Sequence, residues 1–331
     1  MGSSTTGSRP TDRQIALMGS NVMNVDMNLR DRTRGLAVRV DGPAKTNLTL
    51  HVGARREEWG GRHELDTVYC ALGIYDTVTV AAKQPGIGFS LDITGRHLGD
   101  LASSSADLRR NHAVLALFAL AEAAGREPDV SIRIDKRIPV GAGMGGGSVD
   151  AAATLLALNE LWGLNWSIDE LQPVAAQLGA DMPFCLAGGY ARGTGFGEHI
   201  EPLDANSDLV RELREQGFAG EVVVAAYRAE LPTPEVYTSF DVLGGDGFND
   251  LQRAAVSLHP RSGQAIEAAL AAGATQAFVS GSGPSVVAFV PNAAVRQAVC
   301  DAWRTGNLAD RIIMATAPAY PIIHRDVPVD N

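Results

Sequence analysis

One stretch of the sequence is unusually rich in glycine, and its pattern suggests chemistry more directly than any other. Five of the seven residues from 141 to 147 are glycine, and Ser148 follows them. An alternating apolar pattern that predicts a strand precedes the stretch, and a pattern that predicts a helix follows it. Glycine lets the backbone approach a ligand closely, and exposed N–H groups at a helix N-terminus attract anions. The stretch therefore predicts a phosphate-binding loop rather than a plain turn.

The glycine spacing alone does not identify the phosphate ligand. Gly141, Gly143 and Gly146 match the GxGxxG pattern, but a dinucleotide-binding fold needs a second strand that ends in an acidic residue about 20 residues later. The corresponding segment, SIDELQPVAAQLGA, has helical spacing. Gly147 stands where the Walker A pattern has lysine. The loop can thus hold phosphate only through its backbone, and neutralising charge must come from Mg²⁺ and a distant lysine or arginine.

Lys45 is a candidate for that distant charge. Apolar and polar residues alternate along residues 37–52, which predicts a half-buried strand. The period of two places Lys45 and Asn47 on the same face of this strand. Of the 28 basic residues only three are lysines, Lys45, Lys83 and Lys136, and lysine supplies a compact point charge that arginine does not.

Elements that position these residues can be read along the rest of the chain. A composition change near 204–220 separates two predicted α+β domains, at 37–205 and 219–324. Residues 1–36 lack periodicity and are interpreted as a flexible leader. Strands are expected at 76–82, 90–94, 129–140, 221–227, 277–280, 286–290 and 312–317. Helices are expected at 111–125, 151–162, 167–179 and 293–303.

Composition excludes several classes of protein. The formal charge is −10 and no long basic run occurs, which argues against nucleic acid as a partner. No apolar run reaches the roughly 18 residues that a membrane span needs. The three cysteines lie far apart without CxxC spacing, which argues against a zinc site or disulfide frame and favours a reducing compartment, the cytoplasm.

Three segments together resemble the GHMP small-molecule kinases. DGPAKTNLTL (41–50), PVGAGMGGGSVDAA (139–152) and VSGSGPSVVAF (279–289) look like the first, second and third motifs of that family, in the expected order. Within the superfamily, PAKTNL, GRHEL, IDKRIPVGAGMGGGS, LGADMPF and LPTPEVY are similar to segments of the kinases that act on 4-diphosphocytidyl-2-C-methyl-D-erythritol. The resemblance covers roughly residues 37–318.

The resemblance implies a fold and an activity. It implies an α+β chain of two domains, a ribosomal-protein-S5-like ATP-binding domain followed by a ferredoxin-like domain, with the active site in the cleft between them. The implied reaction transfers the γ-phosphoryl group of ATP, with Mg²⁺, to the 2-hydroxyl of that cytidine diphosphate derivative in the methylerythritol phosphate route to isoprenoids. The partner is then a small molecule. The oligomeric state stays open, with a homodimer as one alternative.

The resemblance also assigns catalytic roles. Lys45 and Asp181 would be the catalytic pair, in which Asp181 accepts or orients the hydroxyl proton. Lys45 would keep the carboxylate ionised and stabilise charge on the moving phosphoryl group. Phosphoryl transfer has a loose transition state, so positioning and electrostatics matter more than strong base catalysis.

Nucleotide-binding roles follow from the second motif. The loop from Gly141 to Ser148 would cradle the ATP phosphates, with Ser148 also contacting Mg²⁺. Asn111 and Lys136 would lie near adenine. The expected nucleotide-binding residues are Pro139, Val140, Gly141, Ala142, Gly143, Met144, Gly145, Gly146, Gly147, Ser148, Asn111 and Lys136.

Acceptor-binding roles are implied for a third group of residues. Asn47 would orient the substrate beside Lys45, His63 would hydrogen-bond the cytosine edge, and Thr233 and Tyr237 would border the cytidine. The third-motif loop would close over the site through Gly281, Ser282 and Gly283.

The loop before His63 departs from the family pattern. The family usually has Gly-Tyr-His where this chain has Gly61-Arg62-His63, and the loop REEWGGRHEL is about two residues longer than is typical. The planar guanidinium of Arg62 can stack on a base in place of tyrosine, and Trp59 can add aromatic surface. The sequence thus predicts a kinase with a reshaped cytidine pocket.

Three alternatives remain at this point. The first is another GHMP kinase, acting on homoserine, mevalonate or a sugar, which GRHEL and LPTPEVY disfavour. The second is a non-catalytic nucleotide-binding relative, which the intact Lys45, Asn47 and Asp181 disfavour. A dinucleotide oxidoreductase is the third, and the missing second strand disfavours it.

Overall fold

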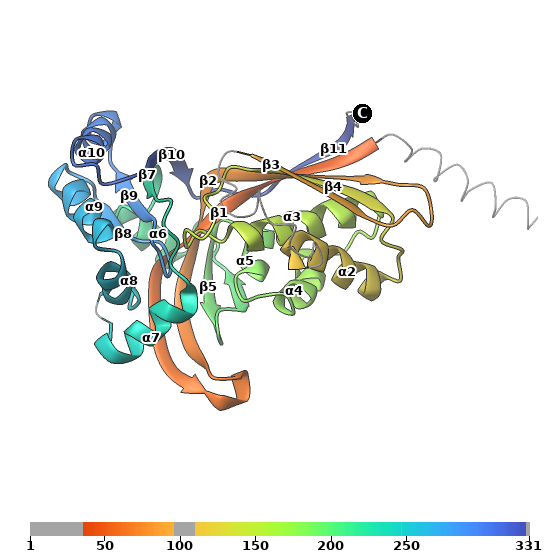
Figure 1. Cartoon of the computed structure of the whole chain (residues 1–331), viewed down its shortest axis with the longest axis horizontal. Helices are drawn as coiled ribbons and strands as arrows, with labels where there is room; N and C mark the ends of the chain where they lie inside the picture. The colour runs from red at the N-terminus through yellow and green to blue at the C-terminus, as the bar shows by residue number, and fades with distance from the viewer. Residues whose placement is uncertain (1–35, 96–109, 246, 329–331) are drawn as a thin grey trace, which may run out of the picture.

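The computed structural model describes residues 36–95, 110–245 and 247–328 of the chain (Figure 1). The predicted leader, up to residue 35, lies outside the described residues. Two β-sheets of unequal size organise the described part, and helices pack against each of them. The predicted α+β class with two units is therefore confirmed.

The first sheet has seven strands and is mostly antiparallel. Its main path runs β11-β1-β2-β4-β3, and the hairpin of β5 and β6 extends it from β2. Only β3 and β4 run parallel among the described pairs of this sheet. The strands are β1 (Leu36–Arg56), β2 (Arg62–Ala82), β3 (Ser90–Gly95), β4 (Val130–Lys136), β5 (Tyr190–Thr194), β6 (His199–Pro202) and β11 (Ile322–Pro328).

Strands β1 and β2 form one long hairpin that extends out of the first sheet and alongside helix α7 (Figure 1). Both strands are longer than the sequence pattern predicts, because three register shifts between them interrupt the alternation that marks a strand. The turn contains a 3₁₀ helix, η1 (Glu57–Trp59). Arg62 and His63 therefore begin β2 instead of lying in a loop.

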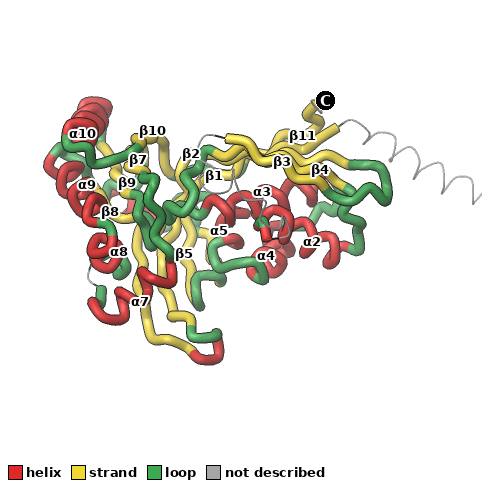
Figure 2. The backbone as a smooth tube through the Cα atoms, viewed as in Figure 1, coloured by secondary structure: helices red, strands yellow, loops and turns green. Residues whose placement is uncertain are grey.

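Four helices cover one face of the first sheet, as Figure 2 shows. Helix α2 begins after Asn111, whose side chain accepts from the backbone N–H of Ala113, and ends at Gly125 in the left-handed conformation. Helix α4 begins with a capping box between Ser167 and Glu170. The central helix, α3, is buried on nearly all sides. Their bounds are α2 (His112–Ala124), α3 (Gly146–Leu161), α4 (Ile168–Ala176) and α5 (Met182–Ala187).

The second sheet has four antiparallel strands in the order β10-β7-β9-β8. Its strands are β7 (Gly220–Ala226), β8 (Gln276–Val279), β9 (Val286–Val290) and β10 (Arg311–Ala317). Buried Trp303 anchors a separate core between this sheet and its helices. The helices of this half are α6 (Asp208–Glu215), α7 (Thr233–Leu243), α8 (Gln252–Leu258), α9 (Pro260–Ala271) and α10 (Ala293–Thr305). No helix in the described ranges is both long and apolar enough to cross a bilayer.

The end of the chain returns to the first sheet. Strand β11 pairs antiparallel with β1, so it belongs to the first sheet, although the predicted second domain extends to residue 324. The sequence pattern missed this strand because β11 is an edge strand whose side chains are mostly exposed, and it therefore lacks a buried apolar face.

Candidate active site

A strand and a short helix bring Lys45 and Asp181 together. Lys45 lies on β1, and Asp181 is the residue that precedes α5. The Lys45 Nζ lies 3.1 Å from Asp181 Oδ2 and donates to Asn47 Oδ1 at 3.0 Å. The ammonium is almost fully buried, whereas the Asp181 side chain keeps 31% of its exposure. The predicted pair thus forms an ion pair whose carboxylate is open to a ligand, and the predicted common face of Lys45 and Asn47 is confirmed.

Tyr69 supplies a second donor to the same carboxylate. Its hydroxyl donates to Asp181 Oδ1 at 3.0 Å and also lies 3.3 Å from the carbonyl of Gly197. Burial, together with the charge of Asp181, raises the pKa of the Tyr69 hydroxyl well above its ordinary value, so the hydroxyl remains a donor. Each oxygen of Asp181 therefore faces one donor. Sequence reasoning missed Tyr69 because its role depends on a segment more than a hundred residues away.

Two successive hydrogen bonds fix the side chain of Asn47. Its Nδ2 donates to Thr67 Oγ1 at 2.8 Å, and that hydroxyl donates to the carbonyl of Thr49 at 2.6 Å. Because the side-chain amide can rotate no further without breaking these bonds, its oxygen points at Lys45. Strand β1 thus delivers Lys45 in one orientation.

The glycine loop lies between β4 and α3, as the sequence predicts, and contacts both halves of the site. The backbone N–H of Lys45 donates to the carbonyl of Met144 at 3.0 Å. Gly143 has φ +75°, and a Cβ there would lie 2.2 Å from the carbonyl oxygen of Ser280. Gly145 has φ +71°, and a Cβ there would lie 2.7 Å from Lys45 Cγ. Glycine is required at both places because of backbone conformation and space. The Met144 side chain points into the core rather than into the cleft.

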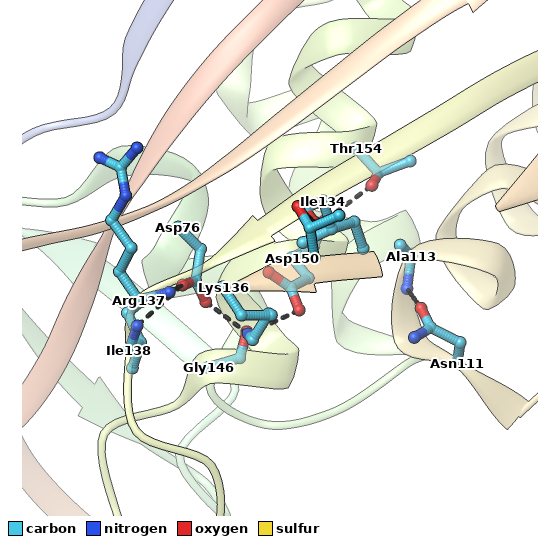
Figure 3. Close-up of polar contacts among 11 residues, drawn as sticks. Asp76, Asn111, Ala113, Ile134, Lys136, Arg137, Ile138, Gly146, Asp150 and Thr154 are labelled. Atoms are coloured by element: carbon cyan, nitrogen blue, oxygen red, sulfur yellow. Dashed lines mark hydrogen bonds and ion pairs between the residues drawn. The ribbon is translucent and has the colours of Figure 1, made fainter. Parts of the chain in front are cut away.

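A buried ion cluster supports the loop from beneath (Figure 3). The Lys136 ammonium contacts Asp76 Oδ2, Asp150 Oδ2 at 2.7 Å and the carbonyl of Gly146 at 3.3 Å. Asp76 Oδ1 also accepts from the backbone N–H groups of Arg137 and Ile138, at 2.5 and 2.8 Å. The cluster thereby ties the end of β4 to the start of α3.

The ammonium of Lys136 has a structural role that the sequence did not indicate. An ammonium has three hydrogens, and three oxygen atoms already surround the Lys136 ammonium, which is buried. The ammonium therefore makes a structural contact that holds the glycine loop, and the predicted position of Lys136 near adenine stays a prediction. Sequence reasoning missed this role because Asp76 of β2 and Asp150 of α3 meet Lys136 only in the folded chain.

Burial and charge act in opposite directions within this cluster. Burial lowers the pKa of Lys136, but Asp150 and Asp76 outweigh it and raise that pKa above its ordinary value. Burial raises the pKa of Asp150 to about 7 although Lys136 opposes it. One oxygen of Asp150 has no hydrogen-bond partner. Lys136 therefore remains the cation of the cluster, and at Asp150 the effect of burial opposes the effect of the Lys136 charge.

The start of α2 borders the same loop. Asn111 lines the cleft, but its side-chain oxygen is engaged as the helix cap at 2.9 Å from the Ala113 nitrogen (Figure 3). Its Nδ2 group is the part that could reach a nucleotide. Arg110 and His112, which sequence reasoning missed, line the cleft beside it. Burial and the charge of Lys136 lower the pKa of His112.

His63 lies between the hairpin and α7. Its Nδ1 is 2.9 Å from the carbonyl of Gly53, and its Nε2 is 3.1 Å from Asp241 Oδ1. The ring stacks on Tyr237 with a centroid distance of 5.3 Å and an interplanar angle of 22°. The Nε2 atom is buried near the Asp241 carboxylate but has no hydrogen-bond partner among the described residues. The predicted hydrogen bond from this side chain to the cytosine edge stays a prediction, and the stacked ring also orients Tyr237.

Arg62 contacts a residue that sequence reasoning missed, Phe196. The guanidinium carbon lies 4.4 Å from the centroid of the Phe196 ring. Trp59 meets the same ring edge-on at 5.9 Å. Phe196 follows β5 in a glycine-rich turn, GTGFGE, and that turn was the available signal. A flat cation and two aromatic rings therefore meet at the tip of the hairpin.

The third-motif loop and α7 close the other side of the cleft. Ser282 Oγ lies 3.0 Å from Thr233 Oγ1, and Ser280 Oγ donates to the carbonyl of Gly143 at 3.1 Å. Thr233 begins α7, and Tyr237 is one turn further along that helix. The loop from 280 to 285 therefore touches the glycine loop, and α7 faces it.

These elements enclose one cleft of about 650 Å³, a volume suited to a small-molecule ligand. Among the described residues, the predicted Arg62, His63, Met144 and Gly283 do not line it. The other predicted residues do: Lys45, Asn47, Asn111, Lys136, Pro139, Val140, Gly141, Ala142, Gly143, Gly145, Gly146, Gly147, Ser148, Asp181, Thr233, Tyr237, Gly281 and Ser282.

Comparison with known proteins agrees with this geometry. Residues 111–189 match the family described as GHMP kinases N terminal domain, and residues 241–307 match GHMP kinases C terminal. The chain is 70% identical over 290 residues to the 4-diphosphocytidyl-2-C-methyl-D-erythritol kinase of Bifidobacterium adolescentis, covering 87% of this chain and 94% of the relative. The chain belongs to the 4-diphosphocytidyl-2-C-methyl-D-erythritol kinase family of GHMP kinases.

Solved structures of GHMP kinases share its fold. A crystal structure of 4-(cytidine 5'-diphospho)-2C-methyl-D-erythritol kinase superposes with a TM-score of 0.66 at 29% identity, over 85% of this chain and 99% of that one. A homoserine kinase from Cytophaga hutchinsonii superposes with a TM-score of 0.65 at 18% identity, over 87% and 97% of the two chains, and shows the fold alone. The two-domain GHMP kinase architecture expected from the motifs is thus confirmed.

Replacing Tyr69 by phenylalanine tests its contact with Asp181. A hydrogen bond to a charged group contributes about 1.5–3 kcal/mol, so Tyr69→Phe should lower kcat roughly 10- to 100-fold. The KM for ATP should change little, because the Tyr69 hydroxyl contacts Asp181 and Gly197 rather than the glycine loop. Steady-state kinetics checks both values. The control is Tyr190→Phe, which removes a buried hydroxyl bonded to the Phe218 carbonyl instead. Equal kcat values for Tyr69→Phe and wild type would exclude the role.

Replacing Lys136 by methionine tests the support of the glycine loop. Lys136→Met leaves two buried carboxylates without their cation, which should lower the free energy of unfolding by about 3–5 kcal/mol. It should also weaken ATP binding, since the loop loses its anchor. Thermal unfolding and calorimetric titration with ATP measure the two effects. The matched control is Arg137→Met, since Arg137 pairs with Asp135 at an exposed site, where such a pair contributes at most about 1 kcal/mol. Unchanged ATP affinity in folded Lys136→Met would contradict the prediction.

Proposed function

We propose that the chain transfers the γ-phosphoryl group of ATP to the 2-hydroxyl of 4-diphosphocytidyl-2-C-methyl-D-erythritol. The observation that carries the proposal is the Lys45–Asp181 pair, which faces the glycine loop across one cleft. The chain that carries this pair is 70% identical to a kinase named for that substrate. The reaction would belong to the methylerythritol phosphate route to isoprenoid precursors and would take place in the cytoplasm.

The roles of the pair follow from its geometry. Asp181 Oδ2 faces Lys45 and Oδ1 faces Tyr69, while part of the carboxylate remains exposed to the cleft. In the proposed reaction Asp181 orients the acceptor hydroxyl and takes its proton as the O–P bond forms. Lys45 stabilises the negative charge that the transferring phosphoryl group carries. Asn47, held by Thr67, fixes Lys45 and borders the acceptor.

The glycine loop is the proposed phosphate site. Its backbone lies at the N-terminus of α3, where N–H groups and the helix dipole favour anions. The described residues contain no group of three or more histidine, cysteine or acidic side chains that could hold a metal ion by themselves. Mg²⁺ typically keeps several water ligands and binds substrate phosphates, and Ser148 is the protein contact proposed for it here. When bound, Mg²⁺ neutralises phosphate charge.

The tip of the hairpin is the proposed cytosine site. Phe196 lines the cleft and offers an aromatic face, and Arg62 lies over that ring. We place the base on Phe196, with the Arg62 guanidinium moving to cover its other face, where the family usually has tyrosine. Tyr237, oriented by His63, and Thr233 border the cytidine from α7. The acceptor hydroxyl then lies between this site and Asp181.

A panel of acceptors tests the proposed function. The full-length chain should release ADP with ATP, Mg²⁺ and 4-diphosphocytidyl-2-C-methyl-D-erythritol, but not with homoserine, mevalonate or galactose. Asp181→Asn should lower kcat by at least about 10³-fold and leave ATP affinity unchanged, because the side chain keeps its size. Turnover with homoserine or mevalonate alone would point to another GHMP kinase. Binding of ATP without turnover of any acceptor would point to a nucleotide-binding relative.

Replacing Arg62 tests the reshaped cytidine site. Arg62→Ala removes a planar cation over the base, so the KM for the cytidine substrate should rise about 5- to 30-fold, equivalent to roughly 1–2 kcal/mol. The kcat should stay within about twofold, since Arg62 is remote from the Lys45–Asp181 pair. The matched control is Arg56→Ala, because Arg56 lies on the same hairpin and pairs with Glu64 at the surface. An unchanged KM in Arg62→Ala would remove Arg62 from base recognition.

A further inference from the structure

Asn249 is a buried side chain whose hydrogen bonds reach the active site without touching the cleft. It lies three residues before α8 and is 2% exposed. Its Nδ2 donates to the carbonyls of Val279 and Gly281, at 2.9 and 2.8 Å, and its Oδ1 accepts from the Leu251 nitrogen at 3.0 Å. Both amide hydrogens and the oxygen are therefore in use. Such a group acts through the residues that it holds rather than on a ligand.

Asn249 and its hydrogen bonds act as a clamp between two segments. The first of these is the strand that carries Lys45. Residues 248–250 run alongside β1, where the Leu50 nitrogen donates to the Phe248 carbonyl at 2.6 Å and the Asp250 nitrogen donates to the Leu50 carbonyl at 2.9 Å. The Asp250 side chain accepts from the Val52 nitrogen at 2.9 Å. The position of Asn249 is thus fixed relative to β1, a few residues from the catalytic lysine.

The other end is the third-motif loop. A methyl group built on Gly281 would lie 3.2 Å from both Lys45 Nζ and Asn47 Oδ1, so this residue packs directly against the catalytic side chains. Its neighbour Ser280 donates to the carbonyl of Gly143 in the phosphate loop at 3.1 Å. The Gly281 carbonyl that Asn249 holds therefore determines how closely the third-motif loop approaches Lys45.

We propose that Asn249 is a positioning residue for phosphoryl transfer, one that sets the distance between the third-motif loop and the Lys45–Asn47 pair. The inference rests on the proposed kinase function. Only an amide can serve here, because two carbonyl acceptors and one N–H donor meet at the same side chain. A carboxylate would face two carbonyl oxygens, and an apolar side chain would leave three buried backbone groups unpaired.

The test compares Asn249→Ala with Asn159→Ala. Asn159 is a matched control, because its buried amide clamps the Trp166 backbone through bonds of 2.9 and 3.0 Å at the far end of α3. Both variants should unfold at lower temperature. Asn249→Ala alone should lower kcat at least about tenfold well below its melting temperature, since small misplacements of reacting groups cost up to about 100-fold. The KM for ATP should change less than about threefold, because the Lys136 cluster still holds the glycine loop.

Hydrogen–deuterium exchange supplies a readout that does not depend on activity. Exchange at residues 280–285 should increase in Asn249→Ala and stay unchanged in Asn159→Ala. If the wild-type chain turned over no acceptor, increased exchange would support the clamp while the proposed function failed. A kcat within about twofold of wild type, or unchanged exchange at 280–285, would overturn the inference.

Gln252 offers a second variant should Asn249→Ala fail to fold. The Gln252 Oε1 accepts from the Val279 nitrogen at 3.0 Å, so Gln252→Ala loosens the same stretch at the Val279 N–H, while Asn249 still holds the Val279 carbonyl. It should lower kcat about two- to tenfold with a smaller loss of stability. A kcat equal to that of wild type in Gln252→Ala would then count against the inference.

Discussion

The ion pair between Lys45 and Asp181 is the contact on which the rest of the site depends. Its two groups come from a strand and a short helix that are distant in sequence, and they meet at 3.1 Å. An ammonium that is nearly buried must keep oxygen partners, since an unpaired buried charge is strongly unfavourable. Asp181 and Asn47 provide these partners. The requirement fixes the position of β1 relative to α5, and Tyr69 and Thr67 hold the two partners in turn.

The glycine loop contains no lysine, and two lysines from other parts of the chain lie on either side of it. Lys45 reaches the site from one side, and the Lys136 cluster supports the loop from the other. The two lysines have different surroundings. The Lys45 ammonium borders the cleft beside the partly exposed carboxylate of Asp181, whereas the Lys136 ammonium is enclosed by two carboxylates and a carbonyl. A buried cluster of this kind contributes little net stability, because desolvation offsets the Coulomb attraction. Its consequence is geometric, since it joins β2, β4 and α3 at the point where the loop begins.

Local patterns predicted the elements well and the distant contacts poorly. Alternation placed Lys45 and Asn47 on one face, and helices were expected at 111–125 and 167–179, where α2 and α4 lie, because these signals depend only on neighbours in the chain. The length of the hairpin was missed, since its register shifts break the alternation. Strand β11 was missed because it is exposed at an edge. Tyr69 and the partners of Lys136 could not be found locally, since each acts on residues brought close only by the fold.

The middle and the tip of the hairpin differ in how tightly their side chains are held, so residues at the tip can change while the Lys45–Asp181 pair stays intact. Lys45 and Asn47 lie in the middle of β1, where both faces are covered, and each of their polar atoms has a partner. Arg62 and Trp59 lie at the tip, where they contact Phe196 and little else. A substitution in the middle must satisfy several buried groups at once, whereas one at the tip changes a single stacked surface. A change at Arg62 therefore alters the surface that covers Phe196 without disturbing the Lys45–Asp181 pair, which is the physical basis for proposing a reshaped cytidine site at the tip.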